Sequence, residues 1–401
     1  MTYSTYCSKS WTDINLDFET RTLRHCCKAE GHEFPETLTE QFISIDSIIQ
    51  QRRQQSLDKV AHSDCNSCWK DYAKGNSAYR DWANRWTDDF INNHKTVLGD
   101  DSFIHYIEVK PDSTCDLACI YCSHTSSSKI AQEEGVKIES KTKEEDYIVF
   151  KSWIKNYIQR EDLKHGQLLF VFLGGEPTAS ERFYELVDFI EDAATTTDKS
   201  IRLEICTNGN SKKFLMDKII DRMSTSKLKW GIGISNESFG VDAELIRHGL
   251  NWDRFQENLV RYMQSPATEL IVMSPTLNAF NLKSFPAYIR SVHELFRKNA
   301  PNKQMTWHGN FISWPEEMDI ANLPTTYFKY IDEAITTITE YKLDKNYVFQ
   351  DSFIDYLKTM KQRIGTNYNS NYKEVAEQFL IRKQNIKKTD ALIALMNNLD
   401  L

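Results

Sequence analysis

Six short apolar or alternating segments, separated by segments with helical periodicity, occupy the middle of this 401-residue chain. Each predicted strand is followed by polar or glycine-containing sequence. Because strands that alternate with helices are joined by crossover connections, we expect these strands to run parallel. The predicted strands are IHYIEVKP (104–111), QLLFVFLGG (167–175), IRLEICTNG (201–209), KWGIGIS (229–235), ELIVMSPT (269–276) and QMTWHGNF (304–311). The predicted helices lie around residues 144–160, 181–194, 211–225, 251–264 and 283–299.

The number of strand–helix units predicts an α/β fold with an incomplete barrel. Six units are fewer than the eight of a complete TIM barrel, so residues 96–314 are interpreted as a partial (β/α)6 TIM-like barrel. Residues 1–95 lack this alternation and hold five of the nine cysteines. We therefore expect a small N-terminal Cys-rich metal-binding domain, whose metal compensates for a thin core. Residues 315–401 are expected to form a helical C-terminal extension.

Net charge and cysteine content limit the cellular compartment and the binding partners that we expect for this protein. The formal net charge of −8 argues against a long nucleic acid as partner, although a free nucleotide stays possible as substrate. The N-terminus has no secretory signal pattern, and no apolar run approaches the roughly 20 residues of a membrane span. We expect a cytoplasmic protein without a membrane partner, whose reduced, clustered thiols bind metal rather than form disulfides.

The segment CDLACIYC places Cys115, Cys119 and Cys122 at C-x3-C-x2-C spacing, directly after the first predicted barrel strand. Three thiolates leave one position open on a metal centre, which is typical of a catalytic site. On a [4Fe-4S] cluster, three cysteines leave one iron free. The alternative is a zinc site that takes a distant histidine, such as His105 or His124, as its fourth ligand.

The second predicted strand ends in LGGEP, Leu173 to Pro177. Gly174 and Gly175 allow the backbone to approach a ligand closely, and Glu176 can accept a hydrogen bond from a cationic amino group. Alone, this segment indicates only a turn. One strand–helix unit after the cysteine triplet, it indicates a binding site.

Together these two motifs resemble those of the radical S-adenosylmethionine (SAM) enzymes. The resemblance implies that Cys115, Cys119 and Cys122 hold a catalytic [4Fe-4S] cluster, whose open iron binds the amino and carboxylate groups of SAM. It also implies reductive cleavage of SAM to a 5′-deoxyadenosyl radical, with an electron donor such as flavodoxin or ferredoxin. The residues that it assigns to SAM are Tyr121, near the adenine, and Gly174, Gly175, Glu176 and Pro177, near the methionyl amine.

Polar residues at two later strand ends fit the same family less specifically. Thr207 and Asn208 begin a TNG turn, and Ser235 and Asn236, followed by Glu237, end the fourth strand. The resemblance places these groups near SAM, and the alternative is that they only form turns and helix caps. Cys206 is expected to be a small buried residue rather than a ligand.

The N-terminal cysteines form a second candidate site. Two separated cysteines and a C-x2-C pair supply four thiolates for zinc or a [4Fe-4S] cluster. The pattern resembles the SPASM and twitch domains that carry auxiliary clusters, but Arg21 stands where their motif has glycine. The candidate ligands are Cys7, Cys26, Cys65 and Cys68, with Cys27 as the alternative to Cys26.

The resemblance spans roughly residues 7–324 and leaves the substrate open. Near the start of a later predicted helix, Arg247, His248 and Asn251 either contact substrate or SAM, or form the polar face of an amphipathic helix; we favour the polar face. Auxiliary clusters of this kind imply hydrogen abstraction from a peptide or protein side chain. The alternatives are modification of a nucleotide, nucleobase, sugar or other small molecule, and a non-catalytic zinc-binding scaffold.

Overall fold

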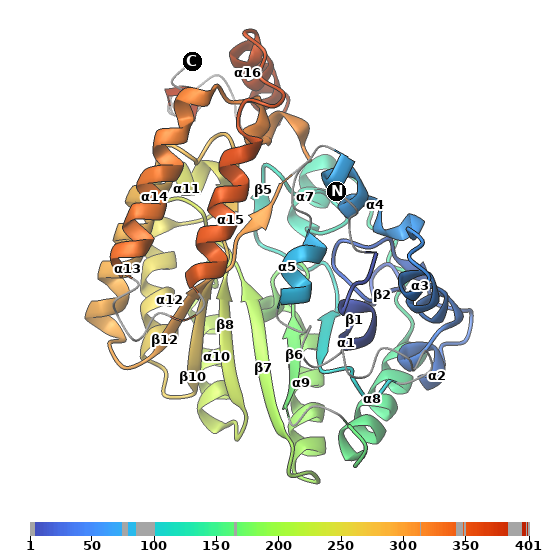
Figure 1. Ribbon diagram of the computed structural model, residues 1–401. Coiled ribbons are helices and arrows are strands. Elements are labelled where there is room, and N and C mark those ends of the chain that lie inside the picture. Colours follow the sequence, from blue (N-terminus) through green and yellow to red (C-terminus); the bar gives the residue numbers. More distant parts are fainter. Residues whose placement is uncertain are drawn as a thin grey trace. The chain divides into compact units, whose positions relative to one another are not determined.

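The computed structural model describes residues 5–73, 79–85, 101–163, 167–312, 314–341, 348, 350–383, 395–397 and 399. The chain divides into two units, the first with residues 1–113 and 139–204 and the second with residues 114–138 and 205–401. Both units contain parallel strands joined through helices, so the predicted α/β class with the strand–helix repeats of a partial barrel is confirmed (Figure 1). The predicted boundary at residue 95 lies outside the described residues.

In the first unit, β4 (Tyr106–Lys110) and β6 (Gln167–Phe172) pair in parallel, with β7 (Ser200–Thr207) next to β6. Helix α8 (Glu144–Gln159) precedes β6 and begins with three acidic residues, which are favourable at a helix N-terminus. Helix α9 (Glu181–Ala194) precedes β7, and its N-cap Ser180 accepts a hydrogen bond from the backbone of Phe183 at 3.2 Å. The acidic first turn of α8 and the cap of α9 explain why both helices begin close to the predicted residues.

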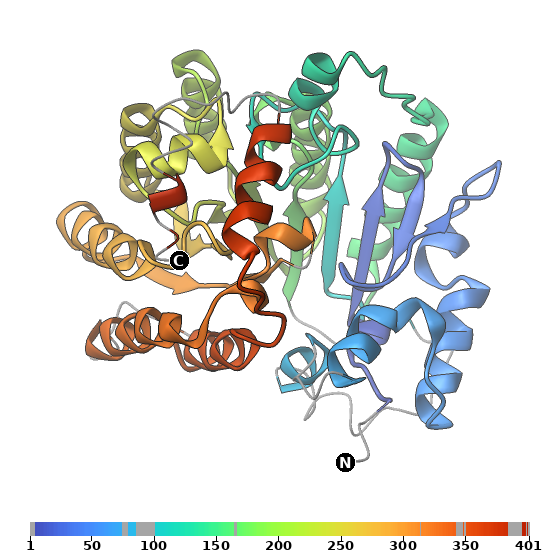
Figure 2. The same cartoon turned by 90° about the horizontal axis from the view of Figure 1, so that it is seen from above.

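The N-terminal segment extends the sheet of the first unit, which the sequence pattern does not predict. Strand β1 (Asp13–Asp17) pairs in parallel with β4, β2 (Thr22–Arg24) pairs antiparallel with β1, and β3 (His32–Glu33) pairs with β2 (Figure 2). The helices of this segment are α1 (Lys9–Thr12), α2 (Glu40–Ser44), α3 (Ser47–Leu57), α4 (Asn66–Ala73) and α5 (Tyr79–Arg85), with a 3-10 turn at Ser63–Cys65.

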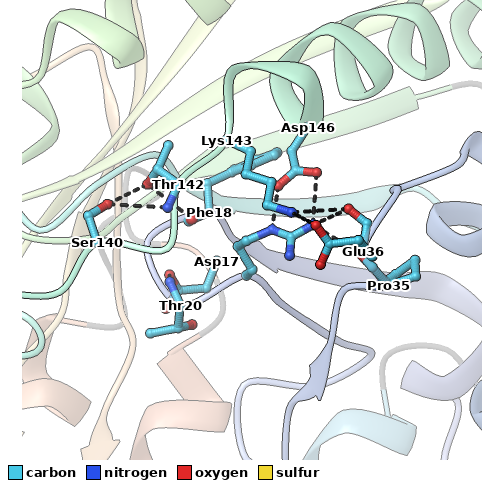
Figure 3. Close-up of polar contacts among 10 residues, drawn as sticks. Asp17, Phe18, Thr20, Pro35, Glu36, Ser140, Thr142, Lys143 and Asp146 are labelled. Carbon is cyan, nitrogen blue, oxygen red and sulfur yellow. Dashed lines mark hydrogen bonds and ion pairs between the residues drawn. The ribbon is translucent and has the colours of Figure 1, made fainter.

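Polar contacts attach this segment to the start of α8 (Figure 3). The ammonium of Lys143 donates to a carboxylate oxygen of Glu36 at 2.6 Å, and the hydroxyl of Thr142 donates to the backbone oxygen of Phe18 at 3.2 Å. The side chain of Arg21 donates to both carboxylate oxygens of the buried Asp146, at 2.7 and 3.2 Å. The N-terminal hairpin is thereby held against α8.

In the second unit, β8 (Lys229–Ile234), β10 (Thr268–Met273) and β12 (Gln304–Trp307) are parallel, with the last residues of β7 beside β8. Their connecting helices are α10 (Lys213–Thr225), α11 (Gly240–Ile246), α12 (Trp252–Gln264) and α13 (Phe285–Asn299). Two-residue strands form two further ladders, β5 (Ala118–Cys119) with β9 (Arg247–His248) and β11 (Thr276–Leu277) with β13 (Asn310–Phe311).

The described part of residues 315–401 is mainly helical, as expected. Helices α14 (Phe328–Tyr341), α15 (Gln350–Arg363) and α16 (Tyr372–Arg382) follow three 3-10 turns, Glu316–Met318, Ile320–Asn322 and Thr325–Tyr327. Helix α14 packs against both α13 and α15. Among the described residues, every helix is too short or too polar to cross a membrane.

Candidate functional site

The three cysteines of the triplet lie in one loop of the second unit, between β4 and α7 (Ser128–Glu134) in the sequence. Cys119 belongs to β5 and is paired with Arg247 of β9. The backbone N–H of Cys122 donates to the carbonyl of Cys119 at 2.9 Å, which closes a tight turn. The backbone N–H of Cys115 donates to the hydroxyl of Ser128 at 3.0 Å. Hydrogen bonds therefore hold the loop at all three cysteines.

The three thiols lie within electrostatic reach of one another. Burial raises the pKa of Cys119, Arg247 opposes this rise, and the thiolates of Cys122 and Cys115 add to it. All three side chains are half-buried. Within the described ranges, no three His, Cys, Asp or Glu side chains converge on a point that holds one metal ion. The donors that this loop offers are three cysteine thiols, the ligand type that iron–sulfur clusters take.

The two histidines considered as zinc ligands are engaged elsewhere. The exposed His124 pairs with Glu134 through an Nδ1 to Oε2 distance of 3.1 Å. His105 belongs to the first unit, where its Nδ1 lies 3.3 Å from the backbone oxygen of Phe103. Neither contact supplies a fourth ligand to the triplet.

Tyr121, Glu237 and Arg247 form a buried polar network next to Cys119. The hydroxyl of Tyr121 donates to Oε1 of Glu237 at 3.1 Å, and Nη2 of Arg247 donates to Oε2 of the same carboxylate at 2.7 Å. Nη1 of Arg247 lies 3.9 Å from the sulfur of Cys119. The side chains of Arg247 and Glu237 are 6% and 1% exposed, so both charges are removed from water and neutralise each other.

The favoured interpretation of Arg247 as part of an exposed helical face is therefore wrong. Arg247 and His248 form β9, and helix α12 begins only at Trp252, with Asn251 as its N-cap. The side chain of Asn251 accepts a hydrogen bond from the backbone of Arg254 at 2.8 Å, which confirms a capping role for Asn251. The pairing of β9 with the cysteine loop joins residues more than 120 positions apart and has no local sequence pattern.

Asp116, inside the cysteine triplet, contacts the end of β7 and was missed by sequence reasoning. Its two carboxylate oxygens accept hydrogen bonds from the side-chain amides of Asn208 and Asn210, at 2.8 and 2.9 Å. The hydroxyl of Thr207 accepts from the backbone N–H of Gly209 at 3.1 Å and shapes the turn. The TNG segment therefore positions the cysteine loop.

The end of β8 carries a buried amide with an unpaired donor. The backbone of Ser235 donates to the carbonyl of Thr207 at 2.9 Å, and the side-chain oxygen of Asn236 accepts from the backbone of Ser238 at 2.9 Å. In the described part of the chain, Nδ2 of the fully buried Asn236 has no hydrogen-bond partner. Because an unpaired buried donor is costly, this amide is suited to contact a bound ligand.

Cys206 is half-buried in β7 rather than buried as expected. Its sulfur lies beside Gly233 of β8, where an added Cβ would come to 3.3 Å from it. Because glycine has no side chain, it leaves part of this thiol uncovered.

The LGGEP segment forms a tight turn in the first unit. Gly174 has φ 139°, and a Cβ there would lie 2.6 Å from the backbone oxygen of Asp112, so only glycine fits. Oε1 of the buried Glu176 accepts hydrogen bonds from the backbone and hydroxyl of Thr178, at 3.2 and 2.6 Å. Pro177 begins the 3-10 turn Pro177–Ala179 that this carboxylate caps. The contact of Glu176 with the methionyl amine stays a prediction.

The N-terminal cysteines gather in the first unit. Cys7, Cys26 and Cys68 are buried, Cys65 is half-buried and Cys27 is exposed. Burial raises the pKa of Cys68 to about 11, and the nearby thiols of Cys7 and Cys65 raise it further. A hydrogen bond with Cys27 is the largest cause of the raised pKa of Cys26, burial raises it further, and Cys7 also contributes. The four candidate ligands thus interact, and the hydrogen bond with Cys26 lowers the pKa of Cys27 to about 6. The choice of Cys26 over Cys27 stays a prediction.

Two buried arginines border this group and were also missed. The guanidinium of Arg80 lies 4.0 Å from the ring centroid of Trp69 and lowers the pKa of Cys7 and Cys68 against the effect of burial. Arg52 of α3 contacts His25, which precedes Cys26, and Asp64, which precedes Cys65. Arg52 therefore joins the two segments that carry these cysteines. Because it lies in a polar stretch of α3, the sequence has no pattern that predicts this contact.

No protein-family model and no curated protein matches the sequence. The solved structures that align with it include anSMEcpe with bound AdoMet and Cp18Cys peptide, at 17% identity and a TM-score of 0.40. That alignment covers 60% of this chain and 61% of the other, so the chain spans about three-fifths of that structure's length. Streptococcus suis SuiB bound to S-adenosylmethionine aligns at 17% identity over 84% of this chain and 71% of its own, with a TM-score of 0.41.

TYW1 with a lysine-pyruvate adduct bound aligns at 17% identity over 57% of this chain and 72% of its own, with a TM-score of 0.33. Likeness at these TM-scores carries no functional argument. The function is therefore argued from the residues of this chain.

Proposed function

We propose that this chain is a radical SAM enzyme that cleaves SAM reductively and abstracts a hydrogen atom from a substrate carbon. The observation that carries the proposal is the loop that brings Cys115, Cys119 and Cys122 together as half-buried thiols without a fourth cysteine in the loop. These three cysteines would hold a [4Fe-4S] cluster and leave one iron open for SAM. When bound, the cluster supplies the electron that cleaves SAM to the 5′-deoxyadenosyl radical.

The protein's own residues bind and orient SAM in this proposal. Tyr121 packs near the adenine, and its hydroxyl is held by Glu237. The unpaired Nδ2 of Asn236 donates to a polar group of SAM, which satisfies this buried donor. The remaining proposed contacts come from Gly174, Gly175, Glu176, Pro177, Thr207, Asn208 and Ser235.

We further propose that Cys7, Cys26, Cys65 and Cys68 hold an auxiliary [4Fe-4S] cluster. The four cysteines, three of them buried, supply the number of thiols that such a cluster takes. The positive charge of Arg80 beside Cys7 and Cys68 favours thiolates at these positions. A peptide or protein side chain is the proposed substrate class, and flavodoxin or ferredoxin is the proposed electron donor.

Anaerobic turnover tests the core of the proposal. The reconstituted protein is incubated with SAM and a strong reductant, and 5′-deoxyadenosine is quantified by mass spectrometry. We expect its formation in the wild type and in Cys206→Ala, a matched control outside both cysteine groups. The triple variant Cys115→Ala, Cys119→Ala, Cys122→Ala is expected to form none. Zinc instead of iron in anaerobically prepared protein would contradict the proposal and favour the scaffold.

A further inference from the structure

Arg247 is the nearest cationic contact to Cys119 among the described contacts of that sulfur. Its Nη1 lies 3.9 Å from the sulfur, within range of a weak N–H to sulfur hydrogen bond. The register of β5 and β9 sets the two residues directly opposite each other. The position of the guanidinium is therefore determined by backbone pairing as well as by its own side-chain contacts.

Two other groups hold the guanidinium in place. Oε2 of Glu237 accepts a hydrogen bond from Nη2 at 2.7 Å, and the ring of Tyr121 lies 5.5 Å from Cζ. The buried Nε of Arg247 has no hydrogen-bond partner in the described part of the chain. An arginine held in this way keeps its charge at a constant distance from the sulfur.

Arg247 presents a different nitrogen to the sulfur than to its counter-ion. Nη1 lies 3.9 Å from the sulfur of Cys119, whereas the hydrogen bond to Glu237 is made by Nη2. A positive charge and a hydrogen bond at a cysteine ligand stabilise the more negative, reduced form of an iron–sulfur cluster. The pair is thus electrically neutral as a whole but positive on the side that faces the sulfur.

We propose that the Arg247–Glu237 pair sets the reduction potential of the catalytic cluster through the sulfur of Cys119. Arg247 raises the potential and Glu237 limits that rise. This inference rests on the proposed function, because it requires a cluster on Cys115, Cys119 and Cys122. It assigns to Arg247 an electrostatic role on the cluster rather than a contact with substrate.

The test is a redox titration followed by electron paramagnetic resonance. The catalytic cluster is identified as the reduced signal that is absent from the variant lacking Cys115, Cys119 and Cys122. At a fixed potential, we expect the ratio of reduced to oxidised cluster to be at least tenfold lower in Arg247→Met than in the wild type. For a one-electron couple, this corresponds to a midpoint lowered by about 59 mV.

Removing the positive charge and removing the negative charge are expected to shift the midpoint potential in opposite directions. Glu237→Gln removes the negative charge and is expected to raise the midpoint potential. Arg247→Lys keeps the positive charge, so its midpoint potential is expected to stay close to the wild-type value. Arg261→Met is the matched control, since Arg261 of α12 pairs with Asp217 of α10 instead. Iron content is measured for every variant.

An unchanged midpoint in Arg247→Met with full iron content would overturn the inference and leave the proposed function intact. If Arg247→Met does not fold, a midpoint in Glu237→Gln that is unchanged or lowered overturns it. If no signal depends on the three cysteines, the proposed function itself fails, so the two failures are distinguishable.

Discussion

At the scale of single residues, the backbone of Arg21 shows how an arginine can stand where the SPASM-like motif has a glycine. The motif has a glycine five residues before Cys26, and Arg21 occupies that position with φ 52°. Glycine adopts this left-handed conformation freely, whereas other residues pay for it. The two hydrogen bonds from Arg21 to Asp146 and one to the backbone oxygen of Pro35 at 2.8 Å offset this cost. Arg21 therefore has the backbone conformation that a glycine would adopt freely, and the selection of Cys26 stays a prediction.

Two substitutions at Arg21 separate the backbone conformation from the ion pair. Both Arg21→Gly and Arg21→Ala lose the contact with Asp146, but only alanine keeps the strain of a positive φ. We expect Arg21→Ala to be less stable than Arg21→Gly by about 1 kcal/mol, measured by denaturant unfolding. Equal stabilities would show that the backbone at this position relaxes.

His25 is expected to make the protein sensitive to mild acid. Burial lowers the pKa of His25 well below its usual value, and the neighbouring charge of Arg52 lowers it further. Folded His25 therefore stays neutral below about pH 6.5, whereas the unfolded chain takes up a proton there. The free energy of unfolding should fall by up to about 1.4 kcal/mol for each pH unit below this value.

His25→Gln removes this titration and keeps a side-chain acceptor for Arg52. Denaturant unfolding between about pH 7.5 and pH 5.5 is expected to show a flatter profile for the variant than for the wild type. Parallel profiles would assign the acid sensitivity to other groups.

At the scale of elements, helix α7 organises the cysteine loop from its first turn. The N-cap hydroxyl of Ser127 accepts from the backbone of Ile130 at 3.3 Å and donates to the carbonyl of Leu117 at 2.6 Å. The next residue, Ser128, contacts the backbone of Cys115. One helix start therefore holds the loop at two points, and its short length hides it from periodicity analysis.

Ser127→Ala is expected to loosen the cluster as well as the helix. The loss of the cap and of the Leu117 contact should cost about 1 to 2 kcal/mol of stability. We expect faster loss of iron to a ferrous chelator than in the wild type. Ser123→Ala, at a half-buried position of the same loop where the hydroxyl contacts only Thr125 among the described side-chain contacts, is the control. Equal rates in the two variants would contradict a positioning role for α7.

At the scale of the whole molecule, each of the two units carries its own cysteine group. If both groups hold a [4Fe-4S] cluster, the double variant Cys65→Ala, Cys68→Ala should lower the iron content from about eight to about four atoms per chain. The signal of the catalytic cluster should persist, since its ligands are unchanged. Iron and zinc analysis together with electron paramagnetic resonance checks this. Loss of zinc without loss of iron would show a structural zinc site instead.

The sequence by itself determined the parallel strand–helix units, the cysteine triplet and the LGGEP turn. These features depend on local periodicity and on residue types that are close in the chain, such as Gly174 beside Glu176. The tertiary structure decided the pairing of β1 with β4 and with β2, and the burial of Arg247 against Cys119 and Glu237. Both depend on contacts between distant segments, and a charged residue has no local pattern that separates a buried pair from a solvated face.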